Sequence, residues 1–199
     1  IKIIKEQVYS YDSSILKADN NSYLDGYWQS EKYFKNIRGL LLKELELNND
    51  EEEKIGKKEK EILSKPNTIA IHFRRGDYIT NKKTNKVHGI CQLEYYKEAL
   101  NKVSGKIKKP ILIIFSDDIY WVKNNFTTEY ETYFFNNPGH IDLVLMSRCE
   151  HQIIANSSFS WWGAWLNKNE HKIVIAPKVW FQAGNKDIKD LLPKDWIKI

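Results

Sequence analysis

Three short segments carry side chains whose types and spacing suit the binding of a phosphate. The first is the H-F-R-R-G-D-Y segment at residues 72–78, in which alternation along a strand places His72 and Arg74 on one face. An arginine at the end of a strand can donate two parallel N–H bonds to a phosphate. Gly76 permits a tight exit from the strand, and Asp77 can pair with an arginine or accept a proton. We predict an anion-binding loop, with an Arg–Asp ion pair that only closes the loop as the alternative.

The second segment, F-S-D-D at residues 115–118, ends an apolar run with two adjacent carboxylates. One interpretation is that a carboxylate at this place accepts hydrogen bonds from a guanine base or a ribose. The alternative is that Asp117 or Asp118 caps the following helix. The D-x-D pattern, which holds a divalent metal on the sugar nucleotide in one large transferase class, does not occur in the chain. Its absence weakens the case for a bound metal.

The third segment, N-S-S-F-S-W-W-G-A-W-L at residues 156–166, delivers small hydroxyl residues to the start of an expected helix. The free N–H groups of a helix N-terminus favour a phosphate, and serine hydroxyls add further donors. The alternative is simple capping by Ser158 or Ser160, with the three tryptophans filling the core. Taken by itself, this segment favours the capping interpretation.

Other function classes lose support from the motifs that the chain lacks. It has no Walker P-loop, no G-x-G-x-x-G fingerprint and no G-x-S-x-G nucleophile elbow. Cys91 and Cys149 stand outside any zinc-ligand spacing, which predicts two reduced thiols and no zinc site. With 31 Lys and Arg against 26 Asp and Glu, the net charge is +5. This excess suits a small anionic ligand, whereas nucleic acid needs a clustered basic stripe.

The elements that must position these segments alternate between strand and helix from residue 68 onward. Short apolar runs predict strands, and apolar residues at three- and four-residue steps predict helices. The strands are expected at 68–73, 111–115, 152–156 and 173–176, and the helices at 92–103, 117–126, 142–148 and within 157–167. This alternation predicts an α/β fold with a parallel sheet covered on both faces. Ligands bind such sheets at the carboxyl ends of the strands, where the three segments lie.

The part of the chain before this alternation has weaker signals. Residues 1–25 mix short apolar runs with Asp, Asn and Ser, which indicates strand and loop. Apolar residues at three- and four-residue steps predict one amphipathic helix over 29–47. The charged stretch at 48–61 is expected to be a surface loop or exposed helix and a hinge between two lobes.

In combination, the three segments resemble glycosyltransferase family eleven, the α-1,2-fucosyltransferases that use GDP-fucose. The resemblance extends over about residues 22–181 and includes the G-Y-W-Q-S-E-K-Y-F stretch at 26–34 and the D-L-V-L-M-S stretch at 142–147. The H-x-R-R-G-D and S-S-F-S-W-W-G-A-W blocks, in this order and at this spacing, are highly specific. The G-G-L-G-N-Q type of motif near the start of that family is absent here. The chain is therefore expected to be the later part of a fucosyltransferase.

The resemblance implies a GT-B fold, in which two Rossmann-like lobes face each other and the second holds most of the donor. Residues 1–65 would be the remainder of the first, acceptor-side lobe with its linker. Residues 66–199 would be the GDP-fucose-binding lobe.

The resemblance also implies roles for individual residues. Arg74, helped by Arg75, would contact the diphosphate and stabilise the charge that grows on it. Asp77 would take the acceptor's proton, or else orient one of the two arginines. The remaining donor-binding residues would be His72, Asp117, Ser157, Ser158, Phe159 and Ser160.

The implied reaction is an inverting, metal-independent transfer of L-fucose from GDP-fucose to the 2-hydroxyl of a galactose-terminated glycan. It needs no cofactor beyond the donor substrate. We expect a cytoplasmic protein, with peripheral association at a membrane left open, no transmembrane segment and no nucleic-acid partner. The rival interpretation is a GDP-sugar-binding or lectin-like fragment without catalysis. Another GDP-sugar as the donor also stays open within the enzyme class.

Overall fold

The computed structural model describes residues 1–184 and 187–199, and their contacts divide into two compact units. The smaller unit comprises residues 1–44 and 184–195. The larger unit comprises residues 45–183 and 196–199, and it contains all three predicted site segments. The assignment of residues 1–65 to an acceptor-side lobe and of 66–199 to a donor lobe concerns function, and it stays a prediction.

The smaller unit is built on two short parallel strands. Strand β1 (Lys2–Lys5) pairs with β2 (Ser22–Asp25), and Lys2 lies opposite Ser22 in the register. Between them runs the 3-10 helix η1 (Ser13–Lys17), which the Asp12 side chain caps. The prediction of strand and loop for this part of the chain is confirmed.

The single helix predicted over 29–47 is wrong for its first half. Two 3-10 turns, η2 (Glu31–Tyr33) and η3 (Lys35–Ile37), precede the α-helix α1 (Arg38–Glu44). Phe34 lies between the two turns with φ −138°, which is outside the helical range and interrupts the helical backbone. The apolar spacing that suggested one helix is therefore divided among three short elements.

The larger unit contains a six-stranded sheet in which every strand pair is parallel. The strand order is β5-β4-β3-β6-β7-β8. The strands are β3 (Thr68–Phe73), β4 (Ile111–Ser116), β5 (Thr132–Phe134), β6 (His151–Ile153), β7 (Val174–Ala176) and β8 (Ile197–Lys198). The predicted α/β class with a parallel sheet is confirmed. The two strands that prediction missed, β5 and β8, are three and two residues long.

The helices of the larger unit follow the predicted alternation, with additions. They are α2 (Asn49–Lys54), α3 (Lys57–Leu63), α4 (Gly76–Thr80), α5 (Lys82–His88), α6 (Leu93–Ser104), α7 (Ile119–Asn125), α8 (Gly139–Arg148) and α9 (Ser158–Leu166). The charged stretch expected on the surface forms α2 and most of α3, and Ile55 within it and Ile62 directly after it are buried. Over the residues that the structure describes, each helix is too short or too polar to cross a lipid bilayer.

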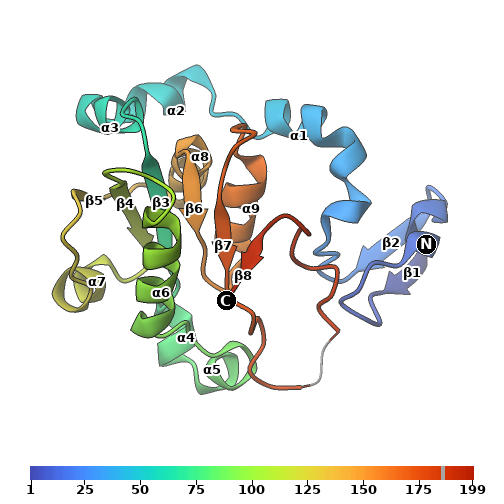
Figure 1. Cartoon of the computed structure of the whole chain (residues 1–199). Coiled ribbons are helices and arrows are strands. Elements are labelled where there is room, and N and C mark those ends of the chain that lie inside the picture. The colour runs from blue at the N-terminus through green and yellow to red at the C-terminus, as the bar shows by residue number, and fades with distance from the viewer. Residues whose placement is uncertain (185–186) are drawn as a thin grey trace. The chain divides into compact units, whose positions relative to one another are not determined.

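Helices cover both faces of the sheet, as predicted. Successive residues of a strand point to opposite faces, so one strand contributes to the core on each side. Ile71 and Phe73 of β3 pack on one side with residues of α6 and α7. Ala70 of β3 packs on the other side with residues of α3 and α8. Helix α9 lies against α8 on that second side (Figure 1). The buried Trp161 and Trp165 of α9 stack on each other, so tryptophans of this segment fill the core.

The strand order reverses at the middle of the sheet, which determines where a ligand is expected. From β3 the chain proceeds to its neighbour β4 and then outward to β5. It then returns to β6 on the opposite side of β3 and proceeds outward to β7 and β8. Ile71 of β3 therefore lies between Ile114 of β4 and Ile153 of β6. In open α/β sheets, ligands bind in the crevice at the carboxyl ends of the strands that flank such a switch point, here β3 and β6.

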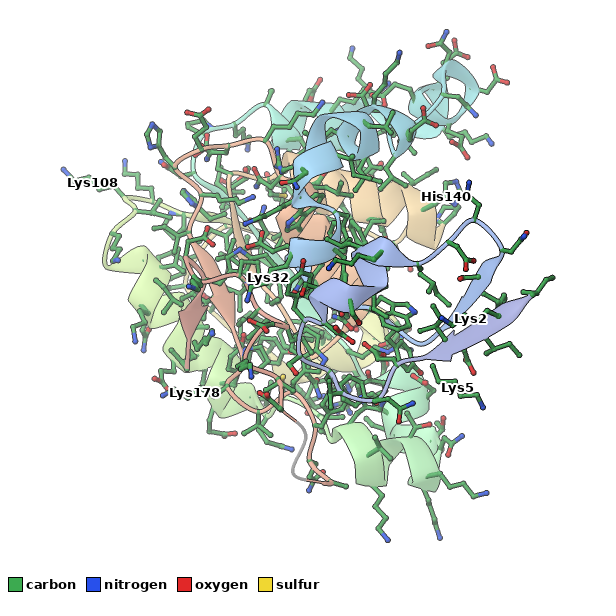
Figure 2. All side chains as sticks on the ribbon, turned by 90° about the vertical axis from the view of Figure 1, so that its right-hand side faces the viewer. Lys2, Lys5, Lys32, Lys108, His140 and Lys178 are labelled. Carbon is green, nitrogen blue, oxygen red and sulfur yellow. The ribbon has the colours of Figure 1, made fainter. Side chains whose placement is uncertain are left out.

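Basic side chains of the larger unit occur at both edges of its sheet. Lys108 precedes β4, at the amino ends of the strands, and Lys178 follows β7, at their carboxyl ends (Figure 2). Both side chains are exposed. The expectation of no nucleic-acid partner stays a prediction.

Candidate functional site

The loop that follows β3 holds Arg74 between two carboxylates. The Arg74 Nη2 atom lies 2.6 Å from Oδ1 of Asp77, and its Nη1 atom lies 2.9 Å from Oδ2 of Asp117. The Arg74 side chain is 30% exposed. Its guanidinium carbon also lies 5.1 Å from the centre of the Tyr78 ring. The arginine is thus fixed in position at the carboxyl end of β3 and remains open to solvent on one side.

Arg75 is less exposed than Arg74 and contacts α7 and the residue that caps it. Its guanidinium carbon lies 3.2 Å from the centre of the Trp121 ring, and its Nε lies 3.4 Å from Oδ2 of Asp118. Only 13% of the Arg75 side chain is exposed. The main-chain N–H of Arg75 donates to Oδ1 of Asp117 at 2.8 Å. Arg75 therefore anchors the loop to α7, and Asp117 bridges the main chain of Arg75 and the side chain of Arg74.

Glycine at position 76 lets the Asp117 carboxylate approach the main chain. A Cβ atom at this position would lie 2.7 Å from Oδ2 of Asp117, far inside van der Waals contact. The carboxylate could not then keep its bonds to both arginines. Gly76 is thus part of the positioning of Arg74, in addition to the tight exit that the sequence predicted.

Helix α9 begins directly after β6 with its first N–H groups available. Ser157 occupies the N-cap position in an extended conformation, and its side chain makes no capping hydrogen bond. The first turn of a helix has N–H groups without intrahelical partners, and they carry partial positive charge. Ser158 is exposed at the first helical position. Ser160 is fully buried and its hydroxyl donates to the carbonyl oxygens of Ala155 and Ser157, so this side chain points into the protein.

His72, two residues before Arg74 on β3, faces the start of α9. Its ring centre lies 5.2 Å from that of Phe159. His72 is 3% exposed, and its Nδ1 has no hydrogen-bond partner among the described residues. Burial, with a smaller effect of the nearby Arg74 charge, lowers the pKa of His72 to about 3. The imidazole is therefore neutral at physiological pH, with one buried polar atom that a bound molecule could satisfy.

Asp142 is a candidate that the sequence analysis did not single out. It lies in the first turn of α8, is 8% exposed, and accepts hydrogen bonds from the main-chain and side-chain nitrogens of Asn137 at 3.2 and 3.0 Å. Burial raises its pKa to about 6, and the nearby Glu59 adds to the shift. Gly139 at the start of the same helix would place a Cβ 3.8 Å from the Phe159 ring. The start of α8 therefore lies beside the Phe159 ring.

The structure brings most of the predicted site residues to one edge of the sheet. Arg74, Arg75, Asp77 and Asp117 form one connected group of ion pairs and hydrogen bonds. His72 and Phe159 connect β3 with the start of α9. Because these two rings are in contact, the end of β3 and the first turn of α9 lie side by side. The fold and this site define an open parallel α/β domain with a cationic side chain and a helix N-terminus at its switch point.

Comparison with known proteins identifies the group to which such a chain belongs. The sequence model described as "Glycosyl transferase family 11" matches residues 6–199. This protein belongs to that family. The chain is 37% identical over 193 residues to the O-antigen biosynthesis glycosyltransferase WbnK of Escherichia coli, covering 92% of this chain and 63% of that protein.

Relatives with lower identity have names that specify the transferred sugar. The chain is 34% identical over 182 residues to an alpha-1,2-colitosyltransferase of Escherichia coli, covering 87% of this chain and 61% of that protein. It is 26% identical over 152 residues to the galactoside 2-alpha-L-fucosyltransferase SEC1 of Bos taurus, covering 72% of this chain and 41% of that protein. A crystal structure of NodZ alpha-1,6-fucosyltransferase soaked with GDP-fucose overlaps 77% of this chain and 55% of its own, with 17% identity and a TM-score of 0.49. The chain spans about three fifths of the two Escherichia coli proteins.

Proposed function

We propose that this protein transfers L-fucose from GDP-fucose to the 2-hydroxyl of a galactose unit in a glycan, with inversion and without a metal ion. Membership of glycosyl transferase family 11 supports the reaction class. The observation that carries the proposal is that Arg74 and the uncapped start of α9 follow β3 and β6, the two strands that flank the switch point of the sheet. Two positively polarised groups that flank one crevice suit a diphosphate.

Several contacts support a nucleotide orientation within this crevice. The diphosphate would lie between Arg74 and the N–H groups of Ser158 and Phe159. The neutral His72 ring, with its buried and unpartnered Nδ1, would face the nucleoside. Arg75 is assigned to the same donor site, and its contacts with Asp118 and Trp121 support an anchoring role there.

In the proposed step, the galactose 2-oxygen attacks the anomeric carbon of the β-linked fucose. The bond from that carbon to the phosphate oxygen breaks, and GDP leaves with the electron pair. The leaving phosphate gains negative charge in the transition state, and the adjacent Arg74 guanidinium stabilises it. The proton of the galactose hydroxyl passes to a carboxylate.

Asp77 is the carboxylate that we assign to this proton. Its side chain is 50% exposed, so an acceptor hydroxyl can approach it. Its Oδ1 pairs with Arg74, which also supports the rival role of orienting that arginine. Because one carboxylate has two oxygens, the pairing of Oδ1 leaves Oδ2 able to accept a proton.

The test is calorimetric binding of GDP and fucose transfer with Arg74→Ala, Arg74→Lys and a control. One charge-assisted hydrogen bond contributes about 1.5–3 kcal/mol, so Arg74→Ala is expected to weaken GDP binding and slow transfer by roughly ten- to a hundredfold. Arg74→Lys keeps the charge but loses the paired donors, so the expected loss is intermediate. The control Arg148→Ala breaks the pair of Arg148 with Glu52 at the other end of α8 and should leave GDP binding unchanged. Near-normal binding and turnover in Arg74→Ala would show that the phosphate assignment is wrong.

A second donor, GDP-colitose, is favoured by one specific observation. The relative named alpha-1,2-colitosyltransferase shares 34% of its aligned residues with this chain. Parallel transfer assays with GDP-fucose and GDP-colitose discriminate between the two sugars. Nucleotide binding without transfer of either sugar would support the rival interpretation of a non-catalytic donor-binding fragment.

A further inference from the structure

A cavity of about 610 Å³ opens at the same edge of the sheet, separate from the arginine loop. Its lining comes from the end of α5, the loop into α6, and the segments that follow β6, β7 and β8. The lining residues are Asn85, His88, Gly89, Ile90, Cys91, Gln92, Tyr95, Asn156, Pro177, Val179, Gln182 and Ile199. Its volume falls within the range of about 300–1,000 Å³ that is usual for small-molecule sites.

Among the described residues, the lining of the cavity offers no acidic or strongly basic side chain to a charged ligand. None of its side chains is Asp, Glu, Lys or Arg in the part of the chain that the structure describes. Burial raises the pKa of the Cys91 thiol to about 11, so this wall also stays neutral at physiological pH. The lining contains the side-chain amides of Asn85, Gln92 and Gln182 together with apolar groups such as Ile90 and Val179. Neutral hydrogen-bonding groups beside small apolar patches match a hydroxyl-rich ring with one C–H face.

The local structure holds the rim of this cavity in place. The main-chain N–H of Gln182 donates to the Val87 carbonyl oxygen at 2.9 Å, which fixes the segment after β7 against the end of α5. Gly89 adopts φ +63°, and a Cβ there would lie 2.5 Å from Oε1 of Gln182. The Gln182 amide can lie on the rim only because position 89 has no side chain. The Asn156 side chain donates to the carbonyl oxygens of His88 and Trp180, which connects the opposite walls.

One aromatic ring separates this cavity from the proposed diphosphate site. The Arg74 guanidinium carbon lies 5.1 Å from the Tyr78 ring centre, and that ring stacks on His88 at 4.8 Å. His88 belongs to the cavity wall. In a nucleotide sugar, a single oxygen joins the glycosyl ring to the distal phosphate. The cavity wall at His88 is therefore two ring contacts, of 5.1 and 4.8 Å, away from the Arg74 guanidinium, which places the cavity beside the proposed diphosphate site.

We propose that this cavity binds a neutral hexopyranose ring of a substrate, either the glycosyl group of the donor or a sugar of the acceptor. The inference rests on the proposed function, because that function supplies both rings. It adds a sugar subsite whose polar contacts come from Gln182 and its neighbours on the rim. The two possible sources of the ring are distinguished by the arms of one experiment.

The experiment uses Val179→Trp and Gln182→Ala, with Lys178→Trp as the matched control. Val179 is 65% exposed on the rim, so a larger ring there obstructs the cavity without disturbing the core. Lys178 is its neighbour in the chain, is exposed and lies outside the lining (Figure 2). Calorimetry measures the binding of GDP and of GDP-fucose, and saturation-transfer NMR measures the binding of lactose.

If the ring belongs to the donor, Val179→Trp weakens GDP-fucose at least about tenfold and leaves GDP unchanged, and Gln182→Ala costs about fivefold. If it belongs to the acceptor, both nucleotides bind normally and the lactose signal falls in both variants. Lys178→Trp matches the wild type in either case. Unchanged binding of both sugars in Val179→Trp overturns the sugar subsite while leaving the proposed function intact. Failure of the wild type to bind GDP refutes the proposed function itself, and the sugar subsite with it.

Discussion

Replacing Gly76 by alanine tests whether Asp117 organises the arginine loop. The added methyl group would lie 2.7 Å from Oδ2 of Asp117, so the carboxylate must withdraw by about 0.7 Å to reach ordinary van der Waals contact. That carboxylate accepts the Arg75 N–H at 2.8 Å and pairs with Arg74 at 2.9 Å. Movement of the carboxylate away from the added methyl group therefore disturbs its contacts with the two arginines.

The expected cost follows from these two contacts. Hydrogen bonds to charged groups contribute about 1.5–3 kcal/mol each to the free energy of unfolding. Alanine in place of glycine in a helix raises this free energy by about 1 kcal/mol. Loss of both contacts, less the gain from alanine, amounts to about 2–5 kcal/mol, and we expect Gly76→Ala to lower the free energy of unfolding by this amount. We also expect GDP affinity to fall by about tenfold, because Arg74 loses one of the two carboxylates that orient it.

Urea denaturation and calorimetry with GDP provide the measurement, and Gly39→Ala provides the control. Gly39 lies in α1, and a Cβ there would have no atom within 4 Å. This control should gain up to about 1 kcal/mol of stability and bind GDP as the wild type does. If Gly76→Ala behaves like Gly39→Ala in both measurements, the positioning role of Asp117 is refuted.

Three further predictions concern other parts of the site. Ser158→Pro removes one N–H at the first helical position, where proline is tolerated, so GDP affinity should fall by about tenfold in calorimetry while Ser158→Ala loses less. The pKa of Asp142 is raised from 3.8 to about 6 in the folded protein, so folding favours its protonated form and the wild type should lose stability as pH rises from 4 to 7. Urea titrations of Asp142→Asn should therefore show a stability gain over the wild type that grows by about 2–3 kcal/mol across this interval, and a constant difference would contradict the shift. Asp77→Asn should bind GDP-fucose normally but transfer sugar at least about a hundredfold more slowly, whereas lost donor binding would assign Asp77 to the orientation of Arg74.

The sequence was sufficient to predict the centre of the sheet but not its edges. Strands β3 and β4 have six residues each and are mostly apolar, which is typical of buried parallel strands. Strands β5 and β8 have three and two residues, which is too short for a periodicity to be recognised. The region 29–47 has helical spacing, but the extended φ of Phe34 interrupts it, and a local pattern does not report that angle.

Contacts in the candidate site could be predicted from the sequence where both contacting residues belong to one short segment. Arg74 and Asp77 are three residues apart, and their pairing followed from the spacing. The contact of Arg75 with Trp121 joins segments 46 residues apart, so only the sheet pairing of β3 with β4 brings them together. Asp142 was missed because it is a single carboxylate in an otherwise apolar helix, and its burial depends on the packing of that helix.

A crystal structure of this protein with GDP tests the central claim most directly. The account predicts diphosphate oxygens within about 3 Å of the Arg74 guanidinium nitrogens and of main-chain N–H groups in the first turn of α9. A diphosphate bound elsewhere, with Arg74 still paired to both Asp77 and Asp117 and no ligand at the start of α9, would contradict it.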